Sequence, residues 1–277
     1  MYSYAALAMV VILAFTGAPT TVAAIPSPKR GLADTHVYAC KNFAAAGDNL
    51  TWTYGWGPST NCTEFIEDKL FVPMLWGKWS IGNFDRNTTY RNIPALLGFN
   101  EPNHKEQSNM SPLEAASLWS EVESIATLVN ATLLGSPAAA PCGGGPTKCN
   151  GGDAVPWFTA FFGNCTNCRV DFLATHFYGC TLKGLKEYLD SLKVFGLPIW
   201  LTEFNCGGGW NDFPVSKQKK WMEQSLPFLD SNPHVHRYSW MAGHAKNDPN
   251  ADLFTWVDGV AMPTELGDVY LSLHSQQ

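Results

Sequence analysis

Short apolar runs recur along the chain after residue 24, and an amphipathic stretch follows most of them. Each run is rich in β-branched or aromatic residues and ends in Gly, Pro, Asn or an aromatic residue, a pattern typical of strands. Strands that alternate with amphipathic helices indicate β/α units around a parallel sheet. We therefore predict eight strands, at residues 30–34, 50–54, 71–75, 95–99, 132–136, 172–176, 199–203 and 236–240.

The apolar runs are continuous rather than alternating, as in the segments ALLGF, TLLGS and PIWLTEF. Continuous runs are typical of central parallel strands that are covered on both faces. Eight of them favour closure of the sheet into a barrel. No linker or low-complexity segment divides residues 25–277, so we predict an α/β protein with a single (β/α)8 barrel domain over that range.

Helix boundaries are also marked in the sequence. Ser111 and Glu114 form a capping box with a proline at the first helical position. Asp153 and Ser216 are predicted to begin two further helices, and Gly196 to end another.

The first residues are predicted to be a targeting segment. Residues 5–15 are apolar, and Val22, Ala23 and Ala24 resemble the small-residue site of signal cleavage. The apolar run is too short to span a bilayer, and no other segment is apolar enough to do so. We predict that residues 1–24 are a signal peptide and that the mature chain is secreted, with no membrane attachment.

Cysteines and glycosylation sequons agree with secretion. Eight cysteines allow 105 pairings, so the sequence leaves the connectivity open. Nearness in the chain favours Cys142–Cys149 and Cys165–Cys168. For the other four cysteines our prediction is Cys40–Cys62 and Cys180–Cys206, which the sequence does not decide. The Cys165–Cys168 spacing also occurs in zinc sites, but the sequence has no second such motif and no histidine pair beside it. Six N-x-S/T sequons begin at Asn49, Asn61, Asn87, Asn109, Asn130 and Asn164.

Composition narrows the class of ligand. The chain is 15% charged and 13% aromatic, with a net charge of −6 and a pI near 5.6. No basic stripe is present to neutralise phosphates, which argues against nucleic acid as a partner. Eleven tryptophans are many for this length. They suit both stacking on neutral sugars and core packing, and composition does not decide between the two uses.

Two glutamates carry the candidate chemistry. In a (β/α)8 barrel the active site lies at the C-terminal ends of the strands, and Glu101 and Glu203 end the apolar runs of the fourth and seventh predicted strands. Those strands are on opposite walls of a barrel. Glycoside hydrolysis needs such a pair, an acid whose pKa is raised by its environment and an ionised partner. The other interpretation is that each glutamate caps a helix or pairs with a lysine.

Around these glutamates the chain resembles a known family. The segments are Leu97-Gly98-Phe99-Asn100-Glu101-Pro102, Gly135-Ser136-Pro137-Ala138, Phe172-Leu173-Ala174-Thr175-His176-Phe177-Tyr178, Pro198-Ile199-Trp200-Leu201-Thr202-Glu203-Phe204 and Tyr238-Ser239-Trp240-Met241. Over residues 30–272 the chain is similar to glycoside hydrolase family 128 and its Asl1-like cell-wall glucanases. The resemblance implies retaining hydrolysis of β-1,3-glucan, with Glu101 as acid/base, Glu203 as nucleophile and Asn100 on the sugar 2-hydroxyl.

Further substrate-binding candidates come from their place along the predicted strands. His176 and Tyr178 alternate on one strand, so both are expected to point to the same face, where one of them orients Glu203 or binds a hydroxyl. A buried structural histidine is the other interpretation of His176. The remaining candidates are aromatic residues near strand ends or in a glycine-rich loop, where they would stack on sugar rings: Tyr54, Trp56, Trp76, Trp210 and Trp240. No third ligand accompanies the His234/His236 pair, so we predict no metal and no cofactor.

The sequence supports a secreted, monomeric endo-β-1,3-glucanase with an acidic pH optimum. Three alternatives remain open at this point: an exo-acting enzyme, a non-catalytic β-1,3-glucan-binding protein on the same barrel, and a hydrolase of another polysaccharide. The presence of both glutamates favours an enzyme over a binding protein.

Overall fold

The structure is a computed structural model that describes residues 27–34, 39–68, 70–143, 148–207, 213–241 and 249–273. Its central sheet is parallel, in the order β2-β1-β7-β6-β5. These strands are β1 (Arg30–Ala33), β2 (Trp52–Tyr54), β5 (Leu173–Phe177), β6 (Ile199–Phe204) and β7 (Val235–Met241). A second parallel pair is formed by β3 (Ala95–Leu96) and β4 (Leu133–Leu134).

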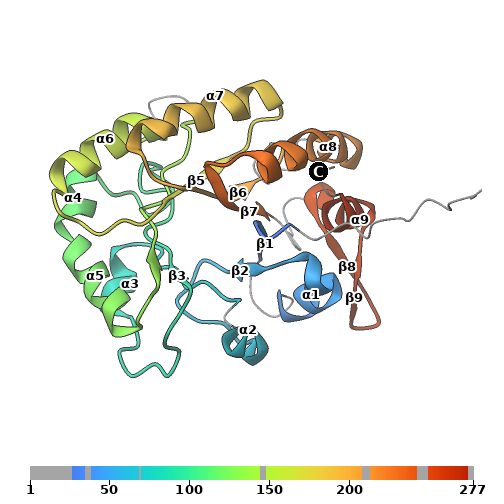
Figure 1. Ribbon diagram of the computed structural model, residues 1–277, viewed down its shortest axis with the longest axis horizontal. Helices are drawn as coiled ribbons and strands as arrows, with labels where there is room; N and C mark the ends of the chain where they lie inside the picture. The colour runs from blue at the N-terminus through green and yellow to red at the C-terminus, as the bar shows by residue number, and fades with distance from the viewer. Residues whose placement is uncertain are drawn as a thin grey trace, which may run out of the picture.

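Isolated parallel bridges continue the pairing between the two sheets. Thr53 of β2 pairs with Phe71, Met74 pairs with Leu97 beyond β3, and Gly135 beyond β4 pairs with Phe172 before β5. The pairings therefore run from β1 through β2, residues 71–74, β3, β4, β5, β6 and β7 back to β1. This is the predicted (β/α)8 barrel, and helices surround it on the outside (Figure 1).

The third predicted strand is present only as bridges. Residues 71–75 contain Pro73, whose missing N–H removes one ladder hydrogen bond, and the described segment pairs at Phe71 and Met74 alone. Residues 71–75 therefore have no strand label of their own, and the fourth and seventh strands of the barrel are labelled β3 and β6.

The described α-helices pack around the barrel. They are α1 (Ala39–Ala46), α2 (Thr63–Glu67), α3 (Lys78–Gly82), α4 (Pro112–Ser117), α5 (Trp119–Leu128), α6 (Ala154–Asn164), α7 (Leu182–Leu192), α8 (Val215–Ser231) and α9 (Glu265–Ser272). An antiparallel hairpin, β8 (Phe254–Val257) and β9 (Val260–Pro263), precedes α9 and was not predicted.

Two of the three predicted caps are confirmed. The Ser111 hydroxyl accepts a hydrogen bond from the N–H of Glu114, and Asp153 accepts one from Ala154. The prediction for Ser216 is wrong, because α8 already begins at Val215 and its N-cap is Pro214. Proline has no side-chain acceptor, and no side-chain cap hydrogen bond is present at this helix start.

The core has two parts, inside and outside the barrel. The smaller cluster contains Trp52, Met74, Leu97 and Trp200 and fills the barrel interior. The larger cluster packs the outer faces of the strands against the helices. Because successive side chains on a strand point to opposite faces, each strand contributes to both parts.

Four disulfides are present, and their connectivity matches the predicted pairs Cys40–Cys62, Cys142–Cys149, Cys165–Cys168 and Cys180–Cys206. No helix in the described part of the chain is both long and apolar enough to span a bilayer. The predicted signal peptide, residues 1–24, lies outside the described residues.

Candidate active site

Glu101 lies just beyond the C-terminal end of β3. Its backbone is anchored on both sides, since Asn100 donates its N–H to the Trp76 carbonyl at 2.8 Å and Glu101 donates to Ala138 at 3.1 Å. Glu101 has a φ of 38°, which is uncommon for a residue with a Cβ. Strained backbone of this kind is often found at functional sites, and here it accompanies a carboxylate that turns into the barrel mouth.

Glu203 lies at the end of β6 and is held by three neutral donors. The Tyr54 hydroxyl donates to Glu203 Oε1 at 3.0 Å, and the Trp56 indole N–H donates to the same oxygen at 2.7 Å. The Tyr178 hydroxyl donates a short hydrogen bond to the other oxygen, Oε2. Hydrogen bonds to a charged oxygen are stronger than neutral ones and fix its direction.

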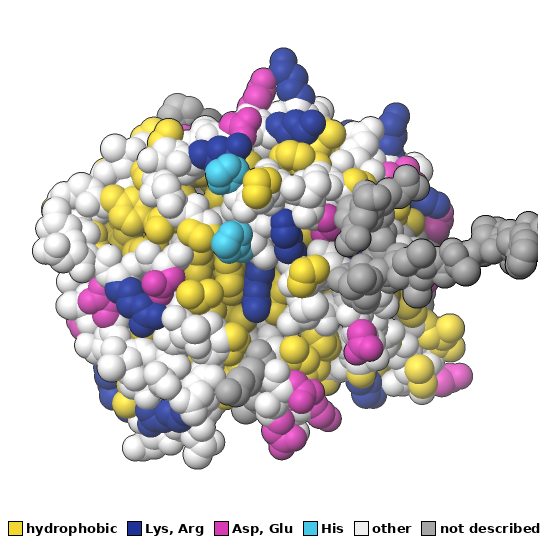
Figure 2. Space-filling view, in the orientation of Figure 1, with side chains coloured by type: hydrophobic (Ala, Val, Ile, Leu, Met, Phe, Trp, Pro, Cys, Tyr) yellow, Lys and Arg dark blue, Asp and Glu magenta, His cyan; other side chains and the backbone are white. Residues whose placement is uncertain are grey.

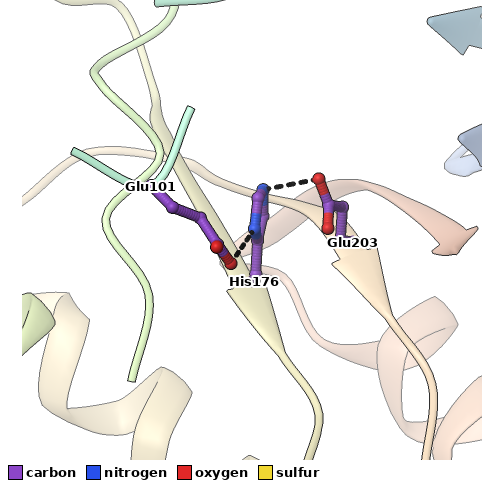
Figure 3. Close-up of side chains that lie close together, drawn as sticks. All are labelled: Glu101, His176 and Glu203. Carbon is purple, nitrogen blue, oxygen red and sulfur yellow. Dashed lines mark hydrogen bonds and ion pairs between the residues drawn. The ribbon is translucent and has the colours of Figure 1, made fainter. Parts of the chain in front are cut away.

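His176 lies between the two glutamates (Figure 3). Its Nδ1 is 2.8 Å from Oε1 of Glu101, in a hydrogen bond. Its Nε2 is 3.3 Å from Oε1 of Glu203, an ion-pair contact whose angles do not make a hydrogen bond. The imidazole has no exposed surface, so its charge is felt almost entirely by the two carboxylates.

The three groups shift one another's protonation. Burial by itself would raise the pKa of Glu101, but the hydrogen bond and charge of His176, followed by the charge of His104, outweigh it and lower that pKa. Burial by itself would lower the pKa of His176, but Glu203 and Glu101 outweigh it and raise that pKa. The sequence predicts a raised pKa on the acid, whereas the environment of Glu101 lowers its pKa and the environment of His176 raises the pKa of the imidazole.

The two tyrosines remain protonated donors. Burial, followed by the charge of Glu203, raises the pKa of Tyr54 and of Tyr178 well above the ordinary value. A phenol that cannot ionise near a carboxylate donates its proton in a hydrogen bond at every working pH. Both phenols therefore remain hydrogen-bond donors to Glu203.

The side-chain ligand atoms of Glu101, His176 and Glu203 lie within 4.8 Å of one another. One nitrogen and two carboxylate oxygens at that spacing are also a donor set that divalent metals use. The pair needs no ion for glycoside chemistry, because one carboxyl can protonate the leaving oxygen while the other attacks.

Asn100 is buried next to Glu101, and its carboxamide is only partly engaged. The amide nitrogen donates to Gln107 Oε1 at 3.2 Å, and Oδ1 has no hydrogen-bond partner among the described residues. A buried acceptor without a partner is uncommon, and a sugar hydroxyl is a suitable donor for it. This agrees with the predicted contact of Asn100 with a 2-hydroxyl.

The prediction that Trp240 stacks on substrate is wrong. Trp240 is fully buried, packs against Phe204 and Tyr270, and donates its indole N–H to the Ala251 carbonyl at 2.9 Å. It points from β7 toward the helices rather than into the barrel mouth. The reason is the pairing register, which sets Trp240 beside Phe204, an outward residue of β6.

Other predicted aromatic residues have mixed outcomes. Tyr54 and Trp56 bind the nucleophile candidate directly, a closer role than the predicted stacking. Trp76 is partly exposed beside Asn100 and packs against Trp79, with ring centroids 6.2 Å apart. Trp210 lies outside the described residues.

Sequence reasoning missed Gln107 and Trp79. Gln107 holds the amide of Asn100, and Trp79, with 56% of its surface exposed, extends the aromatic surface beside Trp76. The Trp76/Trp79 spacing within a short helix-forming segment was the available signal for the second tryptophan. Gln107 is in a loop and had no local signal.

Comparison with known proteins decides the family. A sequence model described as the glycosyl hydrolase catalytic core matches residues 31–270. A solved endo-β-1,3-glucanase of glycoside hydrolase family 128, subgroup II, from Sorangium cellulosum is 31% identical, with a TM-score of 0.76. The alignment covers 90% of this chain and 100% of that one. The chain belongs to glycoside hydrolase family 128.

Two further relatives extend the family-128 comparison. A curdlan-specific exo-β-1,3-glucanase of subgroup III from Blastomyces gilchristii, solved with glucose, is 28% identical with a TM-score of 0.64, and covers 90% of this chain and 100% of that one. The alkali-sensitive linkage protein 1 of Schizosaccharomyces pombe is 32% identical over 262 residues. That alignment covers 89% of this chain but 45% of the yeast protein, so the chain spans less than half of that relative.

The family assignment confirms the predicted resemblance and barrel, and the chain is a glycoside hydrolase of a β-1,3-glucanase family. Endo-acting and exo-acting enzymes both occur among its structural neighbours.

Proposed function

We propose that the chain is a secreted, monomeric, retaining endo-β-1,3-glucanase with Glu203 as nucleophile and Glu101 as acid/base. The observation that carries this proposal is the carboxylate pair, whose nearest oxygens lie within 4.8 Å of each other. Retaining glycosidases hold their two carboxyl groups about 5–5.5 Å apart, whereas inverting enzymes leave roughly 6.5–9.5 Å for a water molecule. The separation therefore supports direct attack by a carboxylate.

The roles of the two glutamates follow from their neighbours. Three neutral donors stabilise Glu203 as an anion and aim it, as a nucleophile requires. Glu101 has a proton source within hydrogen-bond distance, since the imidazolium of His176 is 2.8 Å away. A proton that passes from Nδ1 to Glu101 and on to the glycosidic oxygen allows the leaving group to depart as an alcohol.

The proposed cycle keeps one proton in the Glu101–His176 pair at rest. In the first step Glu203 attacks the anomeric carbon, the C–O bond breaks, and the pair gives its proton to the leaving oxygen. The ester of Glu203 is uncharged, so His176 loses the charge that most raises its pKa and is neutral in the intermediate. In the second step Glu101 takes a proton from a water molecule while the water oxygen attacks the anomeric carbon. The ester bond to Glu203 breaks, which releases the sugar and restores the carboxylate.

Endo action is supported by similarity. Subgroup II endo-β-1,3-glucanases from Sorangium cellulosum and Pseudomonas viridiflava are 31% and 30% identical to the chain. Exo action is the second candidate, because exo enzymes of subgroups III and VI have the same barrel.

The deciding experiment is reducing-sugar release from linear β-1,3-glucan, with Glu203→Ala as the inactive control and product sizes followed over time. A ladder of oligomers at early times supports endo action, and a single small product supports exo action. Binding without cleavage by the wild-type chain would replace the enzyme with a glucan-binding protein. Anomer analysis of the first products by nuclear magnetic resonance tests retention, and the presence of the mature chain in the culture medium tests secretion.

A further inference from the structure

A pocket of about 460 Å³ opens at the end of the barrel opposite the glutamates. Its walls come from Pro28 and Lys29 before β1, Leu133 of β4, Trp200 of β6, and Pro233, Val235, His236 and Arg237 around the start of β7. All these positions lie at the N-terminal ends of parallel strands, and the catalytic residues lie at the C-terminal ends. A volume of this size suits a small molecule.

The pocket combines basic side chains with apolar walls. Its lining contains Lys29, His236 and Arg237 and no acidic residue. Figure 2 shows basic and histidine side chains beside hydrophobic ones near the centre of the face, over the region where the strands lie in Figure 1. An anion with an apolar body matches both properties.

Arg237 is the lining residue with an unsatisfied hydrogen-bond donor. Its guanidinium carbon lies 4.6 and 5.6 Å from the ring centroids of Trp200 and Trp52. Those two centroids are 5.4 Å apart, so both rings lie toward the same side of the guanidinium. Its Nη1 is buried without a hydrogen-bond partner among the described residues, so the guanidinium has a donor that a ligand oxygen would satisfy. Burial lowers the pKa of Arg237 to about 10, which reflects a charge with no compensating anion.

The neighbouring lysine adds charge but has no donors to spare. Lys29 Nζ donates to the carbonyls of Leu229, Asp230 and Asn232 at 3.3, 2.8 and 2.9 Å, so its three N–H groups are used at the end of α8. His236 is exposed at the rim. A single guanidinium fork is therefore the available binding group, and its geometry matches one carboxylate with two parallel hydrogen bonds.

We propose that this pocket, at the N-terminal end of the barrel, binds a small monocarboxylate with an apolar or aromatic body through Arg237. The carboxylate lies in the plane of the guanidinium edge, and the body contacts the apolar walls formed by Pro28, Leu133, Pro233 and Val235. The site is separate from the glycosidase centre, so it does not depend on the proposed function.

Benzoate is the probe that tests the proposal, with benzamide as a neutral molecule of the same shape. Isothermal titration of the whole chain is expected to give saturable benzoate binding with a Kd on the order of 1 mM, typical of so small a ligand. Benzamide is expected to bind at least about tenfold more weakly, because it cannot pair with the guanidinium. Equal binding of the two molecules would overturn the proposal.

Variants locate the site. Arg237→Gln is expected to weaken benzoate binding about tenfold or more. Arg86→Gln, at an exposed arginine that is not part of the pocket lining, is expected to leave it unchanged. Arg237→Lys is the second variant, for use if Arg237→Gln does not fold. It retains the charge but not the planar fork, so it is also expected to weaken benzoate binding. Unchanged binding in a folded Arg237 variant would contradict the assignment.

Two competition arms distinguish this pocket from the sugar site and from a general anion site. Laminaritriose is expected not to displace benzoate, since the sugar site is at the other end of the barrel. Displacement would place benzoate at the glutamates and overturn the proposal. Inorganic phosphate is expected to compete poorly, and phosphate binding as strong as that of benzoate would overturn the proposal by showing an anion site in which the apolar walls have no part.

Discussion

The two walls of the catalytic site hold their glutamates in different ways. On the β6 wall, Glu203 receives hydrogen bonds from two phenols and an indole, none of which changes charge at a working pH. On the β3 wall, Glu101 is hydrogen-bonded to His176, a group that does titrate. His176 also lies 3.3 Å from Glu203, but it makes no hydrogen bond there. The difference teaches that one barrel can surround one carboxylate with donors that keep their protons and hydrogen-bond the other to a group that titrates, through the choice of neighbours.

The largest effect is expected on the β6 wall. Glu203→Ala should lower kcat by about 10⁴-fold or more, since no other group can form the covalent intermediate. Azide should restore part of the activity and give a glycosyl azide of inverted anomeric configuration. Glu187→Ala, at an exposed glutamate of α7, is the matched control and should keep full activity. An azide product of retained configuration would assign Glu203 to the other role.

Glu101→Ala should lower kcat by about 10²- to 10⁴-fold on β-1,3-glucan. The loss should be much smaller on an aryl glycoside, whose leaving group departs without protonation. Azide should here give a product of retained configuration, the opposite of the outcome for Glu203→Ala. Kinetics on both substrates with product analysis make the check, and an equal loss on both would remove Glu101 from the acid role.

His176→Gln should lower kcat/KM by roughly 100-fold and change its pH dependence. In the wild type the pair keeps its proton until pH passes the pKa of His176, which is raised above the ordinary value of about 6.5. Activity should therefore decline on the alkaline side above that value. In the variant the proton can lie only on Glu101, so the decline should move to lower pH.

The measurement is a pH profile of kcat/KM for wild type, His176→Gln and His234→Gln, an exposed histidine that serves as control. A merely structural role for His176 would lower the rate at every pH and leave the alkaline limb where it is.

The smallest effects concern single donors to Glu203. Tyr178→Phe should lower kcat by about tenfold, because the Tyr178 hydroxyl is the group that holds Oε2. Tyr54→Phe should cost about threefold, because Trp56 still donates to the shared Oε1. Steady-state kinetics of the two variants and of their double variant give the comparison. A larger loss for Tyr54→Phe would show that the two oxygens of Glu203 are not held as described.

Much of the scaffold was predictable because strands and their ends are marked locally. Continuous apolar runs located the barrel segments, and the polar residue that ends a run indicated Glu101 and Glu203. That His176 and Tyr178 share a face followed from the period of two along a strand, and in the structure both lie beside Glu203. These inferences need only neighbours within one segment.

Other features needed the assembled barrel. The direction of Trp240 depended on the pairing register between β6 and β7, which shifts near Leu201 and Phe204 and has no signal in either segment alone. The third barrel segment lacks one ladder hydrogen bond at Pro73, and the hydrogen-bond partner of Glu101 is a residue 75 positions away. The unpartnered Nη1 of Arg237 is likewise a tertiary property, because Trp52 and Trp200, against which the guanidinium packs, come from other strands.

The sequence by itself determined the barrel class, the chemical pair and the cysteine pairs near in the chain, because each depends on residues close in sequence or on strand ends. The tertiary structure alone decided which aromatic side chains lie beside the two glutamates and which titratable groups contact each other. Those properties depend on distances of a few ångströms between segments, and on a low-dielectric interior in which such distances set the pKa of each group.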